Sequence, residues 1–258
     1  MKLGLTLQND AQSVIEMRIY LSTSNKYNVL CPINIHFLNK YWPGQDITLV
    51  GYEKVLELTD LPDNVTVHSL GNQDDFGKTW TNALIPFFRD IPEDYFGLIL
   101  DDQVLAHPVD QSKMDLLEKY FKFGRAEKAM IGGGVQFSNG KRIGNGLVEI
   151  RQDVSYRTSL HPAIWRKSYF LKYLKPNFTS WDFELKNEAR NDQARILNFD
   201  YDYPKEPHPY CNVELYNKGE ITINSAGETI TNQPSTPFFK KEDLKYMWDE
   251  IHKEGTKI

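Results

Sequence analysis

The stretch YFGLILDDQVLAHP, residues 95–108, decides the fold that we expect. Its apolar run, Phe96 to Leu100, is short and ends abruptly at two carboxylates, Asp101 and Asp102. Such a run is typical of a strand that is buried on both faces, as in the middle of a parallel sheet. Ligands of open α/β sheets bind beyond the carboxyl ends of such strands, so the two acids mark a candidate binding site.

The two adjacent acids allow two interpretations. Their side chains point in opposite directions on an extended backbone, so one can face a ligand while the other faces a neighbouring loop. Carboxylate oxygens suit Mg²⁺ or Mn²⁺, which take their remaining ligands from water and substrate phosphates. Alternatively, Asp101 or Asp102 only caps the backbone N–H groups of a turn or a helix start. The spacing alone favours neither interpretation.

The composition is that of an ordinary globular protein. Its 258 residues suit one large domain or two small ones that share a sheet. A net charge of −5 argues against a general nucleic-acid binder. No window approaches the roughly 18 apolar residues of a transmembrane segment. Cys31 and Cys211 lie far apart, and the N-terminus lacks a signal-peptide pattern, so we expect a cytoplasmic protein.

Hydrophobic periodicity and turn residues predict alternating strands and helices after an N-terminal extension or edge strand at residues 1–17. In the first half we expect strands at 18–24, 46–52, 65–68 and 96–100 and helices at 30–41 and 80–88, the second with a kink at Pro86. In the second half we expect helices at 112–121, 165–175, 181–197 and 242–253, strands at 130–134 and 146–150, an ordered loop at 199–210 and a hairpin at 210–223. The strand–helix–strand order of the first half is the signature of a parallel sheet.

Three blocks together resemble the nucleotide-sugar glycosyltransferases of the GT-A fold. The first is FGKTWTNALIPFF…DYFGLILDDQVLAHP, at 76–108, which is similar to the helix and strand that lead to the metal-binding DxD motif. The second is YRTSLHPAIWRKSYFLKYLKP, at 156–176, and the third is SWDFE, at 180–184. Both are similar to motifs of a little-characterised bacterial and viral branch. Their order and spacing match over residues 18–216.

The resemblance implies an α/β, GT-A-like fold with a mixed, mostly parallel central sheet flanked by helices. Residues 18–258 would form one catalytic domain, with a nucleotide-binding half at 18–110 and an acceptor-binding half at 111–258. The implied activity is the metal-dependent transfer of a sugar, with inversion, from a nucleotide sugar to a glycan or another hydroxyl acceptor. Mn²⁺ or Mg²⁺ would be the cofactor.

The DD motif, Asp101-Asp102, departs from a strict DxD triplet because Leu100 and Gln103 flank it. In family members with a bare DD, the first acid contacts the ribose and the second the metal. The resemblance therefore implies that Asp101 binds the ribose and Asp102 the metal ion. His161 stands where the branch often carries Gln. It could line the acceptor pocket, bind the diphosphate or be a hydrogen-bonded core histidine.

An inverting transfer needs a carboxylate that takes the proton of the acceptor hydroxyl, and Asp182 and Glu184 are the candidates. A helix N-terminus stabilises the ionised form that such a base requires. The two residues lie at i and i+2 and cannot face the same way, so at most one is the base. The family position favours Glu184. Both residues also suit ordinary roles at the start of a helix.

Further candidates surround these acids. On the donor side, Thr23 and Ser24 follow the first strand, and Asp75 and Lys78 lie in the polar loop at 71–79. Trp181 is the acceptor-side aromatic residue, because it precedes the proposed base. A late histidine completes the metal site in some GT-A enzymes, and the resemblance would give that role to His208. Lys78 is equally compatible with an ordinary solvated lysine.

Two other functions remain open. A sugar-phosphate nucleotidylyltransferase would need a glycine-rich GxGTR-like loop after the first strand, and the residues there, Ser22-Thr23-Ser24-Asn25-Lys26, do not form one. A catalytically degenerate relative would bind a glycan or a partner protein without turnover, and the incomplete DxD motif is consistent with it.

Overall fold

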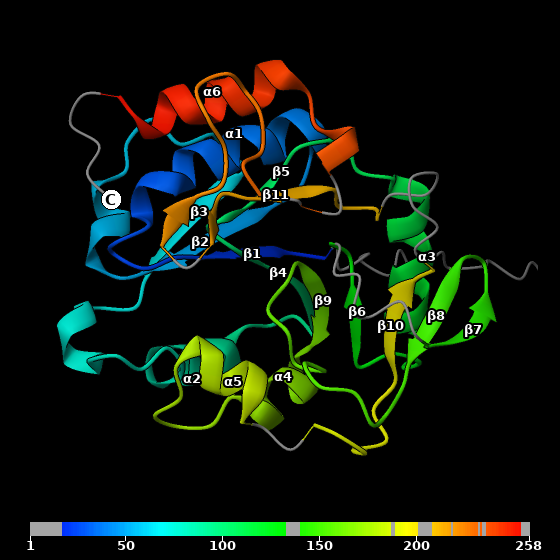
Figure 1. Ribbon diagram of the computed structural model, residues 1–258. Helices are drawn as coiled ribbons and strands as arrows, with labels where there is room; N and C mark the ends of the chain where they lie inside the picture. Colours follow the sequence, from blue (N-terminus) through cyan, green and yellow to red (C-terminus); the bar gives the residue numbers. More distant parts are fainter. Residues whose placement is uncertain are drawn as a thin grey trace, which may run out of the picture.

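A mixed sheet runs through the computed structural model, which describes residues 17–132, 140–186, 189–200, 208–217, 219–231, 233 and 236–253 (Figure 1). Within those residues the sheet has nine strands. Their spatial order is β3 (Val65–Ser69), β2 (Ile47–Gly51), β1 (Ile19–Ser22), β4 (Tyr95–Leu100), β9 (Ala163–Arg166), β6 (Lys128–Met130), β10 (Ile196–Phe199), β8 (Leu147–Ile150) and β7 (Gly140–Gly144).

The sheet is mostly parallel, since only β9 and β8 run against the direction of the other strands described. β3, β2, β1 and β4 are parallel neighbours, and β6 and β10 are parallel to each other. β9 is antiparallel to both β4 and β6, and β8 is antiparallel to both β10 and β7. The mixed, mostly parallel α/β fold expected from the sequence is therefore confirmed.

Helices cover both faces of the sheet (Figure 1). In the described residues these are α1 (Cys31–Tyr41), α2 (Thr81–Asp90), α3 (Gln111–Lys122), α4 (Lys167–Tyr173), α5 (Ser180–Leu185) and α6 (Lys241–Ile251). One core cluster joins Ile19 and Leu21 to residues of α1, α3 and α6, and a second joins Tyr20 to residues of α2, α4 and α5. The alternation of side chains along β1 thus supplies both cores.

The strand that precedes the DD motif, β4, is buried along almost its whole length, because β1 and β9 flank it and its side chains enter both core clusters. A Cβ atom added to Gly97 would lie 2.6 Å from Cδ1 of Ile19. A larger residue at this position would therefore require the Ile19 side chain to move. The parallel register, with Ser22 opposite Leu100, brings the ends of both strands and the polar residues that follow them to one edge of the sheet.

Two predicted helices are partly wrong. The helix expected at 165–175 begins only at Lys167, because residues 163–166 form β9 between β4 and β6. The helix expected at 181–197 ends at Leu185, and Ile196–Phe199 form β10. Both strands lie inside the sheet, where buried strands carry continuous apolar runs that periodicity cannot distinguish from buried helices.

The hairpin expected at 210–223 is confirmed only next to its turn. β12 (Tyr216–Asn217) pairs with β13 (Glu220–Ile221), whereas β11 (Asn212–Glu214) pairs with β5 (Gln103–Leu105). The sequence did not predict β5. Residues 1–16 of the expected extension, 133–134 of the expected strand and 201–207 of the expected loop lie outside the described residues. Every helix in the described part of the chain is too short or too polar to span a bilayer.

Candidate active site

Asp101 is anchored at the end of β4. Its Oδ2 accepts a hydrogen bond of 2.6 Å from Oγ1 of Thr23, the residue after β1. Its backbone N–H donates to the carbonyl oxygen of Ser22 at 3.1 Å, and Asn34 Nδ2 donates to its carbonyl oxygen at 3.1 Å. Burial raises the pKa of the Asp101 carboxyl, and the Thr23 hydroxyl opposes that rise. The structure thus couples Thr23 to Asp101.

Asp102 lies beside an acid that the sequence analysis missed. The backbone N–H of Leu215 donates to the carbonyl oxygen of Asp102 at 2.8 Å, and β11 places Glu214 opposite Gln103. Burial raises the pKa of Asp102, and Asp101 and Glu214 raise it further. Burial likewise raises the pKa of Glu214. Asp102 and Glu214 come together because β11 pairs with β5, more than one hundred residues away in the sequence. No local motif could therefore predict this pair of acids.

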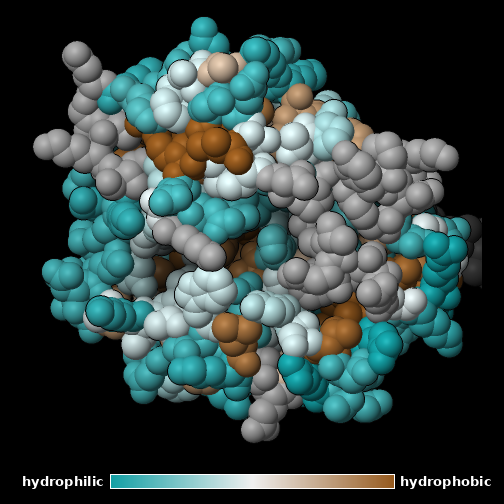
Figure 2. Space-filling model, in the orientation of Figure 1, coloured by the Kyte–Doolittle hydropathy of each residue, from teal (hydrophilic) through white to brown (hydrophobic). Residues whose placement is uncertain are grey.

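A cleft opens at this edge of the sheet, and it has two parts. The β1 lobe, a cavity of about 580 Å³, follows the end of β1, and the α5 lobe, of about 370 Å³, lies against α5. The two lobes share five lining residues, Leu100, Asp102, Ser180, Trp181 and Glu214. Figure 2 shows this face of the molecule hollowed near its centre, between the upper and lower layers of helices. Asp102 therefore lies at the junction of two adjoining cavities.

The β1 lobe brings together most of the expected donor-side residues. Thr23, Ser24, Lys78 and Asp101 line it. Asp75 lies on the exposed surface of the 3-10 turn Gln73–Phe76, so its placement gives no support for a role in the lobe.

The sequence analysis missed three further residues of the β1 lobe, Tyr27, Tyr52 and Gln73. The Tyr27 ring lies 5.5 Å from the Tyr216 ring, and the Tyr52 ring lies 5.9 Å from the Phe76 ring. These are planar, partly apolar walls. The high aromatic content of the chain was the only sequence signal for them.

Glu184 lines the α5 lobe and is held by the chain segment that precedes β9. Its Oε1 accepts the backbone N–H of Leu160 at 2.5 Å. Burial raises the pKa of Glu184, while the Leu160 N–H, the Lys128 charge and the Ser159 hydroxyl oppose that rise. A carboxyl in this environment is a better proton acceptor at neutral pH than an exposed one.

Asp182 has a different environment on the same helix. Its Oδ2 accepts the Thr179 N–H at 3.1 Å, and its own N–H donates to Thr179 Oγ1, which completes a capping box. Lys186 Nζ lies 2.6 Å from its Oδ1. These contacts, the Lys186 hydrogen bond foremost, lower the pKa of Asp182 to about 2. Its carboxylate is therefore engaged in the start of α5.

Lys128 lies beneath the α5 lobe. Its side chain is fully buried, and Nζ donates to the carbonyl oxygens of Arg157 at 3.2 Å and Ser159 at 2.6 Å. Burial lowers the pKa of this amine, while Glu184 opposes the fall. Lys128 thus ties down the segment that holds Glu184.

The two expected histidines occupy different places. His161 lines the α5 lobe, and burial, followed by the Lys128 charge, lowers its pKa to about 4. His208 is buried beside β10, where its Nε2 lies 3.1 Å from Oδ1 of Asn198. Only His161 therefore lies with the candidate base.

The described residues include no group of three or more His, Cys, Asp or Glu side chains that could hold a metal ion by themselves. Among them, however, Oδ1 of Asp102 is buried and has no hydrogen-bond partner. A hard oxygen of this kind, beside the Glu214 carboxylate, fits a divalent ion that takes its other ligands from water and phosphate.

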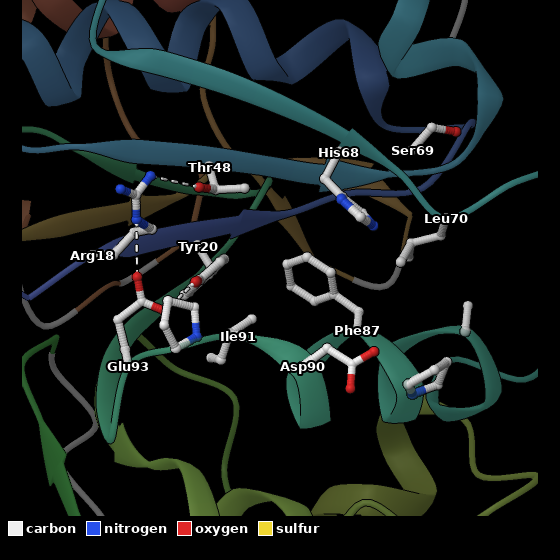
Figure 3. A pocket seen from close by; sticks show the side chains of 13 residues that line it. Arg18, Tyr20, Thr48, His68, Ser69, Leu70, Phe87, Asp90, Ile91 and Glu93 are labelled. Carbon is white, nitrogen blue, oxygen red and sulfur yellow. Dashed lines mark hydrogen bonds and ion pairs between the residues drawn. The ribbon is translucent and has the colours of Figure 1, made fainter.

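A separate cavity of about 560 Å³ lies between α2 and strands β1 to β3 (Figure 3). Its buried acid, Glu93, accepts hydrogen bonds from Arg18 Nε at 3.1 Å and from the Tyr20 hydroxyl at 2.8 Å. Because these polar groups satisfy one another, the Glu93 carboxylate is engaged within the wall of this cavity.

No protein-family model matches the chain, and no curated protein matches its sequence. Solved structures show weak likenesses. HddC from Yersinia pseudotuberculosis is 11% identical with a TM-score of 0.46, and the match covers 71% of this chain and 89% of that one. A UDP-glucose pyrophosphorylase in complex with UDP-glucose is 12% identical with a TM-score of 0.45, and that match also covers 71% of this chain and 89% of the other. A TarS fragment from S. aureus is 13% identical with a TM-score of 0.43 and covers 74% of this chain and 59% of that one. These likenesses assign no activity to the chain.

Proposed function

We propose that the chain is a glycosyltransferase that moves a sugar from a nucleoside-diphosphate sugar to a hydroxyl acceptor. One observation supports this most. Asp102 lies where the two lobes meet, and a second carboxylate, Glu184, lines the α5 lobe alone. A donor in the β1 lobe and an acceptor in the α5 lobe would meet at that junction, with Glu184 on the acceptor side.

The β1 lobe has the chemistry that a nucleotide requires. Tyr27 and Tyr52 offer flat faces against which a nucleobase can stack. Asp101 would accept a hydrogen bond from a ribose hydroxyl, and Thr23 holds it in place for that role. Lys78 is a cation at the wall of the same lobe, suited to a phosphate oxygen.

Asp102 and Glu214 would hold the Mn²⁺ or Mg²⁺ ion that the resemblance implies. When bound, such an ion supplies Lewis-acid stabilisation to a departing diphosphate. The ion would also relieve the repulsion among the acids at the junction, which contributes to the raised pKa of Asp102.

Glu184 would act as the general base. It takes the proton of the acceptor hydroxyl while that oxygen forms a bond to the anomeric carbon, and the bond from this carbon to the diphosphate breaks. The nucleoside diphosphate leaves with the bonding electron pair. Attack from the side opposite the diphosphate inverts the anomeric centre. Asp182 is the poorer candidate, because its carboxylate is committed to the capping box and to Lys186.

The test is a thermal-shift panel of UDP-, GDP-, CMP- and dTDP-sugars, each with and without Mn²⁺, followed by assay of nucleotide release. A ligand at 100 times its dissociation constant stabilises a fold by about 2.7 kcal/mol. We expect one nucleotide to stabilise the protein in the presence of metal, and Asp102→Asn to abolish the metal dependence. Binding without any turnover would instead support a catalytically degenerate binding domain. The absence of any shift would contradict the metal-dependent transferase and would favour a catalytically degenerate domain that binds a glycan or a partner protein.

A further inference from the structure

The polar lining of the α5 lobe has no cation among its described residues. Three of the lining side chains are acids, Asp102, Glu184 and Glu214. The other polar groups are an amide, hydroxyls and the imidazole of His161. A divalent ion at Asp102 would not offset three carboxylates completely. Protonated carboxyl groups are neutral, so the lining of the lobe would carry no positive charge in that state either.

Lys128 is the cation beneath this lobe, yet it cannot bind an acceptor. It is fully buried, and its Nζ is bonded to two backbone carbonyl oxygens. The His161 imidazole is neutral at pH 7, since its pKa is lowered to about 4. Its Nδ1 is buried and has no hydrogen-bond partner in the described part of the chain. A neutral imidazole with an unpaired nitrogen suits a hydroxyl group and gives no charge to attract an anion.

An exposed apolar surface on α5 extends from Trp181, in the lining of the lobe, to Leu185, outside it. Trp181 is 63% exposed, and Leu185, one helical turn further on, is 51% exposed. Residues four apart lie on the same side of a helix, so the two side chains form one surface. A flat indole next to hydroxyl, amide and carboxylate groups matches a ligand with an apolar face and a hydrogen-bonding rim. Sugar rings have this form.

We propose that the α5 lobe takes an uncharged carbohydrate as its acceptor, with a sugar ring on Trp181 and its hydroxyl groups directed to Glu184 and His161. This rests on the proposed glycosyl transfer. Acceptors that carry phosphate or carboxylate groups would face the three acids without a compensating cation from the lining. Like charges brought together across a binding site oppose binding and select against such partners.

The experiment measures acceptor binding without a donor, so that it does not depend on turnover. Saturation-transfer NMR on the full chain would compare neutral oligosaccharides with matched sugars that carry a carboxylate or a phosphate, at low salt. We expect only the neutral members to bind. Preferred binding of the anionic members would overturn the proposal, and so would the absence of binding by every sugar.

Two variants locate the binding. Trp181→Ala should weaken neutral-sugar binding about tenfold, whereas Trp181→Phe should retain most of it, because loss of an aromatic contact is worth up to about a tenfold change in affinity. Phe123→Ala removes another exposed aromatic side chain, at the end of α3, and should change nothing. Equal binding by all three variants would overturn the assignment to Trp181. Nucleotide release from the donor alone tests the proposed function separately, since it needs no acceptor.

Discussion

Nζ of Lys128 donates a hydrogen bond of 2.6 Å to the carbonyl oxygen of Ser159, one residue before the N–H that holds Glu184. A buried amine therefore fixes the segment that fixes the proposed base. The positive charge also favours the ionised form of Glu184 and so opposes the rise of its pKa caused by burial.

We expect Lys128→Met to move the acid limb of the pH–rate profile to higher pH, because Glu184 ionises less readily without the nearby cation. The measurement is kcat/KM for nucleotide release across pH 5 to 8. Lys167→Met is the matched control, since Lys167 Nζ also bonds a backbone carbonyl oxygen, that of Ile91 at 2.8 Å. An unchanged profile in Lys128→Met would limit Lys128 to a packing role.

Substitution of the two candidate bases separates catalysis from stability. Glu184→Gln keeps the size of the side chain but cannot take a proton, so kcat for transfer should fall about 10²- to 10⁴-fold. Asp182→Asn should preserve kcat and lower the melting temperature, because it weakens the capping box and removes the charge that pairs with Lys186. Steady-state kinetics and thermal melts of both variants check this. The reverse pattern would assign the base to Asp182.

The sequence predicted the residues of the site that follow directly after buried strands. The apolar run of β4 and the acids after it gave the sheet edge, and the polar residues after β1 gave the opposite wall. The cap at Thr179 could also have been found, since a hydroxyl residue and an acid three positions apart form the spacing of a capping box.

The rest depended on long-range packing. Glu214 reaches Asp102 only because β11 pairs with β5. The apolar start of β10, Ile196-Leu197, is too short for periodicity to separate a strand from a helix. Lys128 gave no signal either. Lysine side chains are mostly exposed, and this one is buried because it contacts two carbonyl oxygens and the ring of Trp165.

A buried ion pair close to the α5 lobe should contribute strongly to the free energy of unfolding of the protein. The Arg157 side chain is inaccessible and lies 2.9 Å from Asp192, which is also buried. Its guanidinium donates to the carbonyl oxygens of Arg151, Ala189 and Ala194 at 2.8, 2.8 and 2.7 Å. Arg157→Met leaves a buried acid and three carbonyl groups without this partner and should cost about 3–5 kcal/mol.

Urea unfolding of Arg157→Met, compared with Arg151→Met, checks this expectation. Arg151 forms an exposed ion pair with Asp153, and such pairs contribute little to stability. Comparable losses in the two variants would show that the buried pair has no special role.

The DD motif should make the metal-free protein less stable at alkaline pH. Burial raises the pKa of Asp101 and Asp102 above their values in the unfolded chain. Their contribution to stability is thus fully present below a pH of about 4 and is lost as the pH rises through the raised values. The lowered pKa values of His161 and His208 act in the opposite direction, but only below about pH 6.5, where a histidine in the unfolded chain gains its proton. The lowered pKa of Lys128 also acts in the opposite direction, but it is one group against the two acids.

The decisive window is therefore pH 7 to 8.5, and the measurement is the free energy of unfolding at both ends, with and without Mg²⁺. We expect it to fall with rising pH in the absence of metal and to fall less when Mg²⁺ is present. Asp101→Asn and Asp102→Asn should each reduce the slope. Asp182→Asn should leave the slope intact, because a pKa of about 2 keeps that acid ionised throughout. A slope that persists in both variants of the DD motif would place its origin in other groups and remove the thermodynamic argument for a cation at Asp102.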